Sequence, residues 1–239
     1  KTHWWRYLLA VSIIFFMWLL VGSIPSVFLI LWLVVTAGPQ AMFDTNLLAA
    51  ADQTLVFVVS MLASVFFLLG IFLAVRFVHE RPFRTLVTPA RRMDWRRVFQ
   101  AFAAWFAIVA LLAGLEALLY PGRYVLTLDL SRFLPFALLA LVLVPIQTSA
   151  EEFFFRGYLL QGFGLRIRNI WILSLLSGLL FGLPHLFNPE AQANYFLMGL
   201  YYVSMGAVLA YVALRDGRLE LVLGLHAANN LMVLFTNYE

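Results

Sequence analysis

Residues 133–161 read FLPFALLALVLVPIQTSAEEFFFRGYLLQ, an apolar run that ends in a group of ionisable side chains, Glu151, Glu152 and Arg156. About 20 apolar helical residues are enough to cross the hydrocarbon core of a bilayer, so the run predicts a transmembrane helix. A charge near the bilayer centre costs about 2.5 kcal/mol or more, and such charges usually face the interior of a helix bundle and have a function. The three charged groups are therefore candidate functional residues.

The composition extends this interpretation to the whole chain. Hydrophobic residues make up 64% of the sequence and charged residues only 12%, whereas soluble domains have roughly half and about a quarter. The formal net charge of +4 comes from arginines in short loops, as membrane topology requires, so we expect no nucleic-acid partner. The chain has no cysteine, which excludes disulfides, thiolate nucleophiles and cysteine-ligated metals.

Apolar runs of similar length recur along the sequence, and together they predict an all-α, polytopic integral membrane bundle of about seven transmembrane helices. The predicted spans are residues 7–36, 54–78, 98–120, 133–161, 170–187, 194–214 and 221–237. The first run is long and contains Pro25, so an eighth span is expected if that run folds back as a hairpin. We expect a single membrane domain over residues 1–239.

Arginines predict how the spans are oriented. The connection 79–97 holds six arginines, and the connections after the fourth and sixth spans also carry arginines. By the positive-inside rule these loops and the amino terminus are cytoplasmic. Seven spans then place the carboxyl terminus outside. We expect a multi-pass protein of a bacterial or archaeal inner membrane.

Glu152 and Arg156 are spaced four residues apart, with the glutamate on the amino-terminal side, which is the favourable order for a helical ion pair. In a low-dielectric interior each charge makes the other tolerable. Glu151 lies about 100° around the helix from Glu152, away from the natural pairing position. The spacing therefore indicates a structural pair, Glu152 with Arg156, and a carboxylate at 151 that is suited to general base chemistry.

Two histidines accompany the glutamates in apolar segments. His185 occurs in FGLPHLFN and His226 in LGLHAANNLM. His226, Asn229 and Asn230 are spaced i, i+3 and i+4, so they share one face of a helix. A histidine beside an asparagine can donate hydrogen bonds to a developing oxyanion. The simpler alternative for the two asparagines is hydrogen bonding between helices.

A glutamate, two histidines and an asparagine are compatible with three kinds of chemistry. They can activate a water for peptide hydrolysis, bind zinc as a His₂Glu set, or carry protons through a transporter or other non-catalytic membrane protein. The chain has neither an H-E-x-x-H helix nor a G-x-S-x-G elbow, so an ordinary zincin or serine hydrolase is not indicated. The spacing does not decide among the three.

Three motifs in order carry a family resemblance. EEFFFR (151–156) matches E-E-x-x-x-R, FGLPH (181–185) matches F-x-x-x-H, and HAANN (226–230) matches H-x-x-x-N. They resemble the CAAX protease and bacteriocin-processing family of intramembrane glutamic endopeptidases, to which the eukaryotic type II CAAX prenyl endopeptidase belongs. The resemblance covers roughly residues 148–235, within a predicted catalytic core of 133–237.

The resemblance implies roles for the matching residues. Glu151 is expected to be the general base and to share the attacking water with His185. His226 and Asn230 are expected to stabilise the oxyanion, and Glu152 with Arg156 to support Glu151. It further implies a peptide or lipidated-peptide substrate, membrane lipid as surroundings, and an active site open to the cytoplasm. We expect no cofactor and no metal, with zinc as the alternative.

The predicted spans contain one inconsistency. His185 lies fifteen residues into its span but His226 only about five into its own, and both spans start from the cytoplasmic side. Straight spans of equal depth would hold the two histidines apart. The spans must therefore be offset or tilted, or their boundaries must differ from the predicted ones by a turn or more.

Overall fold

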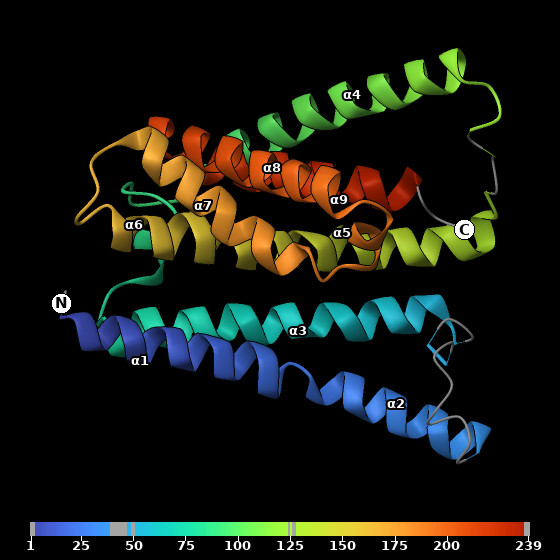
Figure 1. Ribbon diagram of the computed structural model, residues 1–239, viewed down its shortest axis with the longest axis horizontal. Helices are drawn as coiled ribbons and strands as arrows, with labels where there is room; N and C mark the ends of the chain where they lie inside the picture. Colours follow the sequence, from blue (N-terminus) through green and yellow to red (C-terminus); the bar gives the residue numbers. More distant parts are fainter. Residues whose placement is uncertain (1–2, 39–46, 49–50, 124, 126–127, 237–239) are drawn as a thin grey trace. The chain divides into compact units, whose positions relative to one another are not determined.

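The computed structural model describes residues 3–38, 47–48, 51–123, 125 and 128–236, and this part of the chain is built of helices joined by turns and short connections (Figure 1). No strand occurs among the described residues. The prediction of an all-α fold is confirmed.

Most of the predicted spans appear as long apolar helices. Five helical stretches within the described residues are long and apolar enough to cross a membrane: Trp4–Ala37, Gln53–Val78, Trp95–Leu119, Leu130–Phe163 and Tyr195–Asp216. Two shorter apolar helices are Ile170–His185 and Glu220–Thr236. These segments correspond to the seven predicted runs, and they make the chain an integral membrane protein.

The first run is a bent helix and not a hairpin. It consists of α1 (Trp4–Phe15), a π-helical stretch η1 (Phe16–Val21) and α2 (Ile24–Ala37), which follow one another in the same general direction (Figure 1). Pro25 lies in the first turn of α2, where its missing N–H costs no helical hydrogen bond. The proline therefore starts a second helical segment after the break and does not reverse the chain.

The packing of the chain separates it into two compact units. The first unit contains residues 1–83 and 127–150, and the second contains residues 84–126 and 151–238. In the first unit, α1 packs on α3 (Gln53–Leu73), which continues into the π-helical η3 (Ala74–Val78). Gly70 permits this approach, since a Cβ there would lie 3.1 Å from the Cα of Ile14.

The second unit holds two closely packed helix pairs. Helix α7 (Ile170–His185) packs along α8 (Tyr195–Asp216), and α4 (Trp95–Leu119) packs along α9 (Glu220–Thr236). A Cβ at Gly178 would lie 2.5 Å from the carbonyl oxygen of Val203. Small residues at such crossings let two membrane helices approach closely.

Polar residues set the ends of the helices in the second unit. The Asn169 side chain accepts hydrogen bonds from the first turn of α7, and Asn194 does the same for α8. Such caps satisfy amide groups that have no partner within the helix. Helix α8 ends at Gly217, whose φ of 69° is left-handed and favours glycine.

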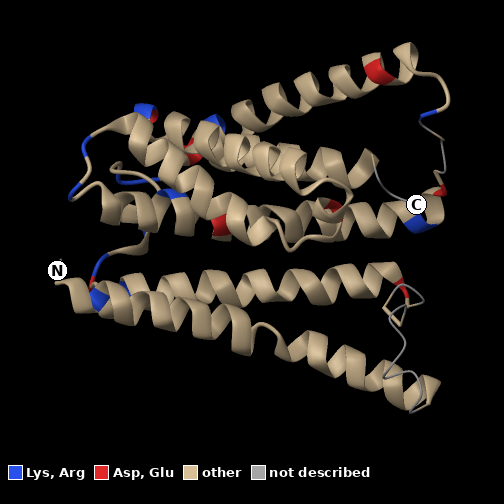
Figure 2. Cartoon of the chain, viewed as in Figure 1, with Lys and Arg blue, Asp and Glu red and all other residues tan. Residues whose placement is uncertain are grey.

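The arginine-rich connections of the second unit lie at one end of its helices. Arginines of the segments 84–97, 166–168 and 215–218 gather where α7 and α9 begin and where α8 ends (Figure 2). This arrangement agrees with the positive-inside pattern. The cytoplasmic orientation of this end stays a prediction.

Candidate active site

The helix that carries the two glutamates changes its geometry next to them. Helix α5 (Leu130–Glu152) continues without interruption into the π-helical segment η5 (Phe153–Leu159) and the short α6 (Leu160–Phe163). Residues 153–158 are all buried. Because π-helical turns occur frequently at functional sites, this segment supports the interpretation of the adjacent charges as functional.

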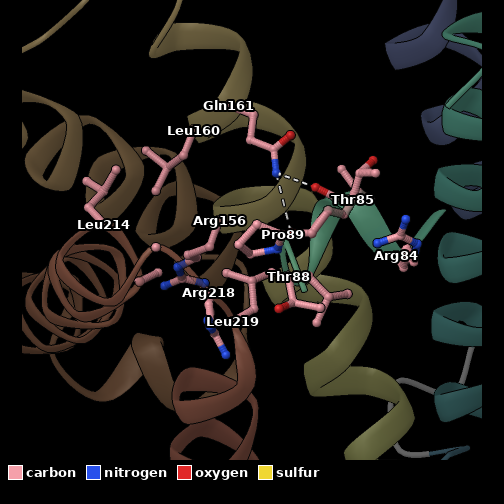
Figure 3. Close-up of a pocket in the computed structure, with 14 residues that line it drawn as sticks. Arg84, Thr85, Thr88, Pro89, Arg156, Leu160, Gln161, Leu214, Arg218 and Leu219 are labelled. Carbon is pink, nitrogen blue, oxygen red and sulfur yellow. Dashed lines mark hydrogen bonds between the residues drawn. The ribbon is translucent and has the colours of Figure 1, made fainter. Parts of the chain in front are cut away.

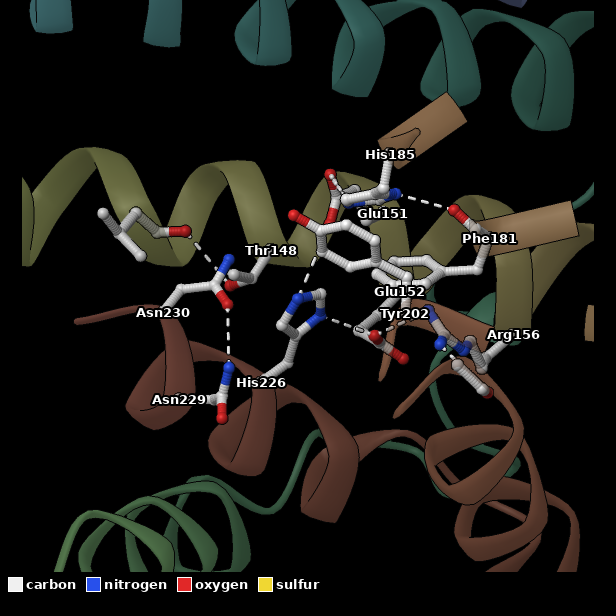
Figure 4. A network of polar contacts seen from close by, with 12 residues as sticks. Thr148, Glu151, Glu152, Arg156, Phe181, His185, Tyr202, His226, Asn229 and Asn230 are labelled. Atoms are coloured by element: carbon white, nitrogen blue, oxygen red, sulfur yellow. Dashed lines mark hydrogen bonds and ion pairs between the residues drawn. The ribbon is translucent and has the colours of Figure 1, made fainter. Parts of the chain in front are cut away.

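Glu152 is the centre of a buried polar row. Its side chain is fully buried, and its Oε1 accepts a hydrogen bond from Arg156 Nη1 at 2.9 Å. The predicted ion pair is therefore confirmed. The same oxygen lies 2.7 Å from His226 Nδ1 (Figure 4). Arg156 also donates from Nη2 to the carbonyl oxygen of Gly206 at 3.1 Å, so a backbone group of α8 holds the arginine in place.

Glu151 lies between the two histidines. Its Oε1 is 3.9 Å from His185 Nε2, and its Oε2 is 3.6 Å from His226 Nε2. Both distances exceed that of a direct hydrogen bond. The side chains of Glu151 and His185 are 16% and 18% exposed, whereas that of His226 is 3% exposed. The side of this cluster that is open to another molecule is thus the one formed by Glu151 and His185.

A backbone carbonyl determines the protonation of His185. Its Nδ1 lies 2.6 Å from the carbonyl oxygen of Phe181, one helical turn earlier. A carbonyl oxygen only accepts hydrogen bonds, so Nδ1 must carry the proton. In the neutral ring, Nε2 is then an acceptor and faces Glu151.

Phe181 packs among the charged groups. Its ring centroid is 4.2 Å from that of His185 and 5.7 Å from that of His226. The Arg156 guanidinium lies 4.5 Å from the same ring, which is within the range of a cation–π contact. One aromatic side chain therefore limits the movement of both histidines and of the arginine.

The two asparagines of α9 have different surroundings. Asn229 accepts a hydrogen bond from Trp105 Nε1 at 3.4 Å and donates to Tyr201 Oη at 3.4 Å. It therefore acts as a link between helices. Asn230 receives a hydrogen bond from Asn229, and its side chain projects from α9 on the same side as that of His226 (Figure 4).

The position at which α9 begins explains how His226 reaches the same site as His185. Glu220, the first residue of α9, is already fully buried. The preceding Leu219 N–H donates to the carbonyl oxygen of Val87 at 2.8 Å, which ties the start of the helix to the 84–94 connection. His226 thereby reaches Glu151 although it lies only two turns into its helix. The two histidines meet Glu151 from the end of α7 and from the beginning of α9.

Sequence reasoning did not identify Tyr202 and Glu190, which lie beside His185. Tyr202 Oη donates to Glu190 Oε1 at 2.6 Å, and the Tyr202 ring is 4.8 Å from the His185 ring. Burial opposes ionisation of Glu190, but hydrogen bonds from Tyr202 and Asn188 lower its pKa below the usual range. Glu190 lies in the 3₁₀ segment η6 (Pro189–Ala193), just after α7. No motif pointed to this segment, because an ordinary acidic residue in a connection carries no signal.

Zinc ligation requires donors that converge and second-shell acceptors that orient them. Within the described residues no group of three or more His, Cys, Asp or Glu side chains converges closely enough to hold a metal ion. The second ring nitrogen of each histidine has such an acceptor. Glu152 serves that purpose for His226 and the Phe181 carbonyl for His185, as orienting groups do at metal sites.

Comparison with known proteins finds a family that resembles the segment carrying this site. Residues 130–232 match the family model described as type II CAAX prenyl endopeptidase Rce1-like. This segment is similar to Rce1-like domains. It begins at the start of α5 and contains all three motifs, so the resemblance seen in the sequence is confirmed.

The chain has a relative among the curated proteins. The chain is 43% identical over 165 residues to the uncharacterized protein YyaK of Bacillus subtilis (strain 168). The match covers 69% of this chain and 55% of the relative, so the chain spans about half the length of that protein. No solved structure matches the chain.

Proposed function

We propose that this chain is an intramembrane endopeptidase that hydrolyses a peptide bond with a water activated by Glu151 and His185. One observation carries the proposal. A partly exposed carboxylate stands 3.9 Å from the acceptor nitrogen of a partly exposed histidine, in a domain of a protease family. At such a separation two acceptors are bridged well by a water.

The protonation of His185 supports this role for the water. Because Nδ1 carries the proton, Nε2 accepts one hydrogen bond from the water while Glu151 Oε1 accepts the other. The water then donates both of its protons and directs a lone pair away from both acceptors, toward a scissile carbonyl. Glu151 takes a proton as the C–O bond forms and later delivers it to the leaving amine, which is general base and then general acid catalysis.

His226 and Asn230 are proposed to stabilise the oxyanion. The Nδ1 atom of His226 lies against Glu152 Oε1, and its Nε2 atom faces Glu151, so Nε2 is the atom directed toward the reacting group. Donors held in place in a site shielded from water are effective at stabilising negative charge that develops in a transition state.

The substrate is proposed to be a peptide or lipidated peptide that reaches the site within or beside the bilayer. The cluster residues lie on apolar helices, and the matched family carries the name of a prenyl endopeptidase. We place the arginine-rich end of the second unit on the cytoplasmic side of an inner membrane, with the site open to the cytoplasm.

The decisive experiment compares membrane peptides from cells that carry the intact protein with those from cells that carry Glu151→Gln. Peptides with new termini that occur only with the intact protein would identify both the activity and the substrate. Glu116→Gln is the matched control, because Glu116 pairs with Arg123 away from the cluster. Identical peptide sets in cells carrying the intact protein and Glu151→Gln, at equal protein levels, would contradict the proposal.

A zinc-dependent peptidase with the same residues is the second candidate. Both histidines have their Nδ1 atoms oriented by an acceptor, which leaves both Nε2 atoms directed toward Glu151. This is the arrangement that second-shell groups give to histidine ligands. Chelator sensitivity separates this candidate from the first.

A further inference from the structure

A pocket of about 540 Å³ lies in the second unit, at its arginine-rich end (Figure 3). Its walls come from η4 (Phe83–Leu86) and the residues after it, from α6, from the last turn of α8 and from the turn before α9. Gln161 of α6 donates to the carbonyl oxygens of Thr85 and Leu86, at 3.0 and 3.4 Å. These contacts join two of the walls, so the pocket belongs to a defined local structure.

The pocket is separate from the catalytic cluster but shares one residue with it. Neither glutamate, neither histidine nor Asn230 lines it, whereas Arg156 does. Arg156 uses Nη1 for Glu152 and Nη2 for Gly206, and its buried Nε has no hydrogen-bond partner among the described residues. The Arg156 side chain is 0% exposed, so it contributes positive charge behind the wall of the pocket and no accessible donor.

The charged side chains that line the pocket in the described part of the chain are all positive. Arg84, Arg156 and Arg218 line the pocket, and no carboxylate does among the described residues. Of the nearby carboxylates, Asp216 binds Arg97 at 2.6 Å, Glu152 binds Arg156 and His226, and the fully buried Glu220 accepts from the Asp94 N–H at 3.4 Å. Arg218 is half-buried, and the described part of the chain supplies no ion-pair partner for it.

We propose that this pocket binds a phosphate ester, with Arg218 as its principal ligand and Arg156 as a buried cation behind the wall. Guanidinium groups match the oxygens of a phosphate and form charge-assisted hydrogen bonds with them. Leucines at positions 160, 214 and 219 line the same pocket and suit the apolar part of an ester. This site does not depend on the proposed peptidase activity.

The position of the pocket indicates an anionic phospholipid as the natural source of the phosphate. It lies where the helices of the second unit meet their arginine-rich connections, which is the expected membrane–water boundary. Basic pockets between membrane helices at that boundary bind anionic lipid headgroups. A free phosphate ester presents the same chemistry to Arg218.

The test measures ligand-dependent rises in the unfolding midpoint of the purified chain in nonionic detergent. Three probes are compared: inorganic phosphate, short-chain phosphatidylglycerol, and a phosphate-free diacylglycerol with the same chains. Phosphatidylglycerol should stabilise the protein in a saturable way and diacylglycerol should not. Arg218→Gln should weaken binding by about tenfold or more, the loss expected for one charged hydrogen bond.

Two further variants decide what the result means. Arg218→Lys keeps the charge and should retain part of the affinity. Arg215→Gln is the matched control, since Arg215 is an exposed arginine of the same turn and does not line the pocket. It should bind as the unaltered protein does. Stabilisation by inorganic phosphate that matches the lipid supports a free phosphate ester as the source, and stabilisation by the lipid alone supports a headgroup.

The proposal is overturned by any of three results. These are stabilisation by diacylglycerol as strong as that by phosphatidylglycerol, no stabilisation by either phosphate-bearing probe, and equal losses for Arg218→Gln and Arg215→Gln.

Discussion

Glu152 contacts His226 across 74 residues of chain, with Oε1 2.7 Å from Nδ1. The oxygen that completes the ion pair with Arg156 thus also orients a histidine beside Glu151. Two adjacent glutamates on one helix therefore have different partners and different surroundings. Glu152 is fully buried among cationic or donor groups, and Glu151 is partly exposed. This difference leads directly to different expectations for their substitution.

Glu151→Gln should abolish the general base and preserve the fold. We expect turnover of a reporter peptide to fall by about 10²–10⁴-fold, with an unfolding midpoint close to that of the unaltered protein. Steady-state cleavage in detergent and thermal unfolding are the measurements. Full activity of Glu151→Gln would require another residue to be the base.

Glu152→Gln should damage stability. The change leaves the buried Arg156 without its counter-charge, and breaking a buried pair in this way costs on the order of 3 kcal/mol. The unfolding midpoint should drop clearly below that of Glu151→Gln, which carries the same chemical change one residue away. If Glu152→Gln were stable but inactive, the roles assigned to Glu151 and Glu152 would have to be reversed.

Asn230 should matter for the chemical step more than for binding. Asn230→Ala should lower kcat by about 10²–10³-fold with little change in substrate affinity, as expected for an oxyanion donor. Asn230→Asp should be at least as harmful, because it places an acceptor where negative charge develops. Asn229→Ala is the control for loss of an interhelical link. Equal turnover in the unaltered protein and both Asn230 variants would make Asn230 a structural residue.

Metal analysis should find no stoichiometric zinc, and a chelator should leave activity intact. Two ligand atoms on one tetrahedral zinc lie about 3.3 Å apart, whereas Glu151 lies 3.6 and 3.9 Å from the two histidine nitrogens. About one zinc per chain, together with activity that is lost to a chelator and restored by zinc, would establish a zinc-dependent peptidase.

Tyr202→Phe should make the protein less stable in a pH-dependent way. The pKa of Glu190 lies below its ordinary value of 4.5 in the folded protein. Its stabilising contribution is therefore complete above 4.5 and is lost as pH falls through the folded-state pKa. The variant should lose stability at pH 7 and differ less from the unaltered protein near pH 3.

The control for this experiment is Tyr195→Phe, because Tyr195 is an exposed tyrosine of the same helix. Thermal unfolding at the two pH values should show no such dependence for the control. A constant difference between Tyr202→Phe and the unaltered protein at both pH values would show that Glu190 does not stabilise the fold through its charge.

Two glycines should respond to alanine in opposite directions. Gly178→Ala forces a methyl group against the Val203 carbonyl on α8 and should destabilise the α7–α8 pair. Gly114→Ala introduces a methyl group with no atom within 4 Å, and it should stabilise helix α4 by roughly 0.5–1 kcal/mol. The measurement is the unfolding midpoint of each variant. If both substitutions raised it, helices α7 and α8 would be packed less closely than the structure shows.

The sequence by itself determined the features that depend on local spacing and hydropathy. Long apolar runs predicted the helices, because a membrane span must satisfy its backbone hydrogen bonds internally. The four-residue spacing predicted the pair of Glu152 and Arg156, since such residues share a helix face. Three short motifs were enough to indicate the family.

Only the tertiary structure decided which groups from different helices meet. It brought His226 to Glu152, set Glu151 between two histidines, and placed Tyr202 and Glu190 beside His185. These contacts depend on the depth at which each helix begins and on how closely helices approach, as at the buried start of α9 and the crossing at Gly178. Hydropathy is nearly uniform along such spans, so it carries no information about their offset, which packing between helices sets.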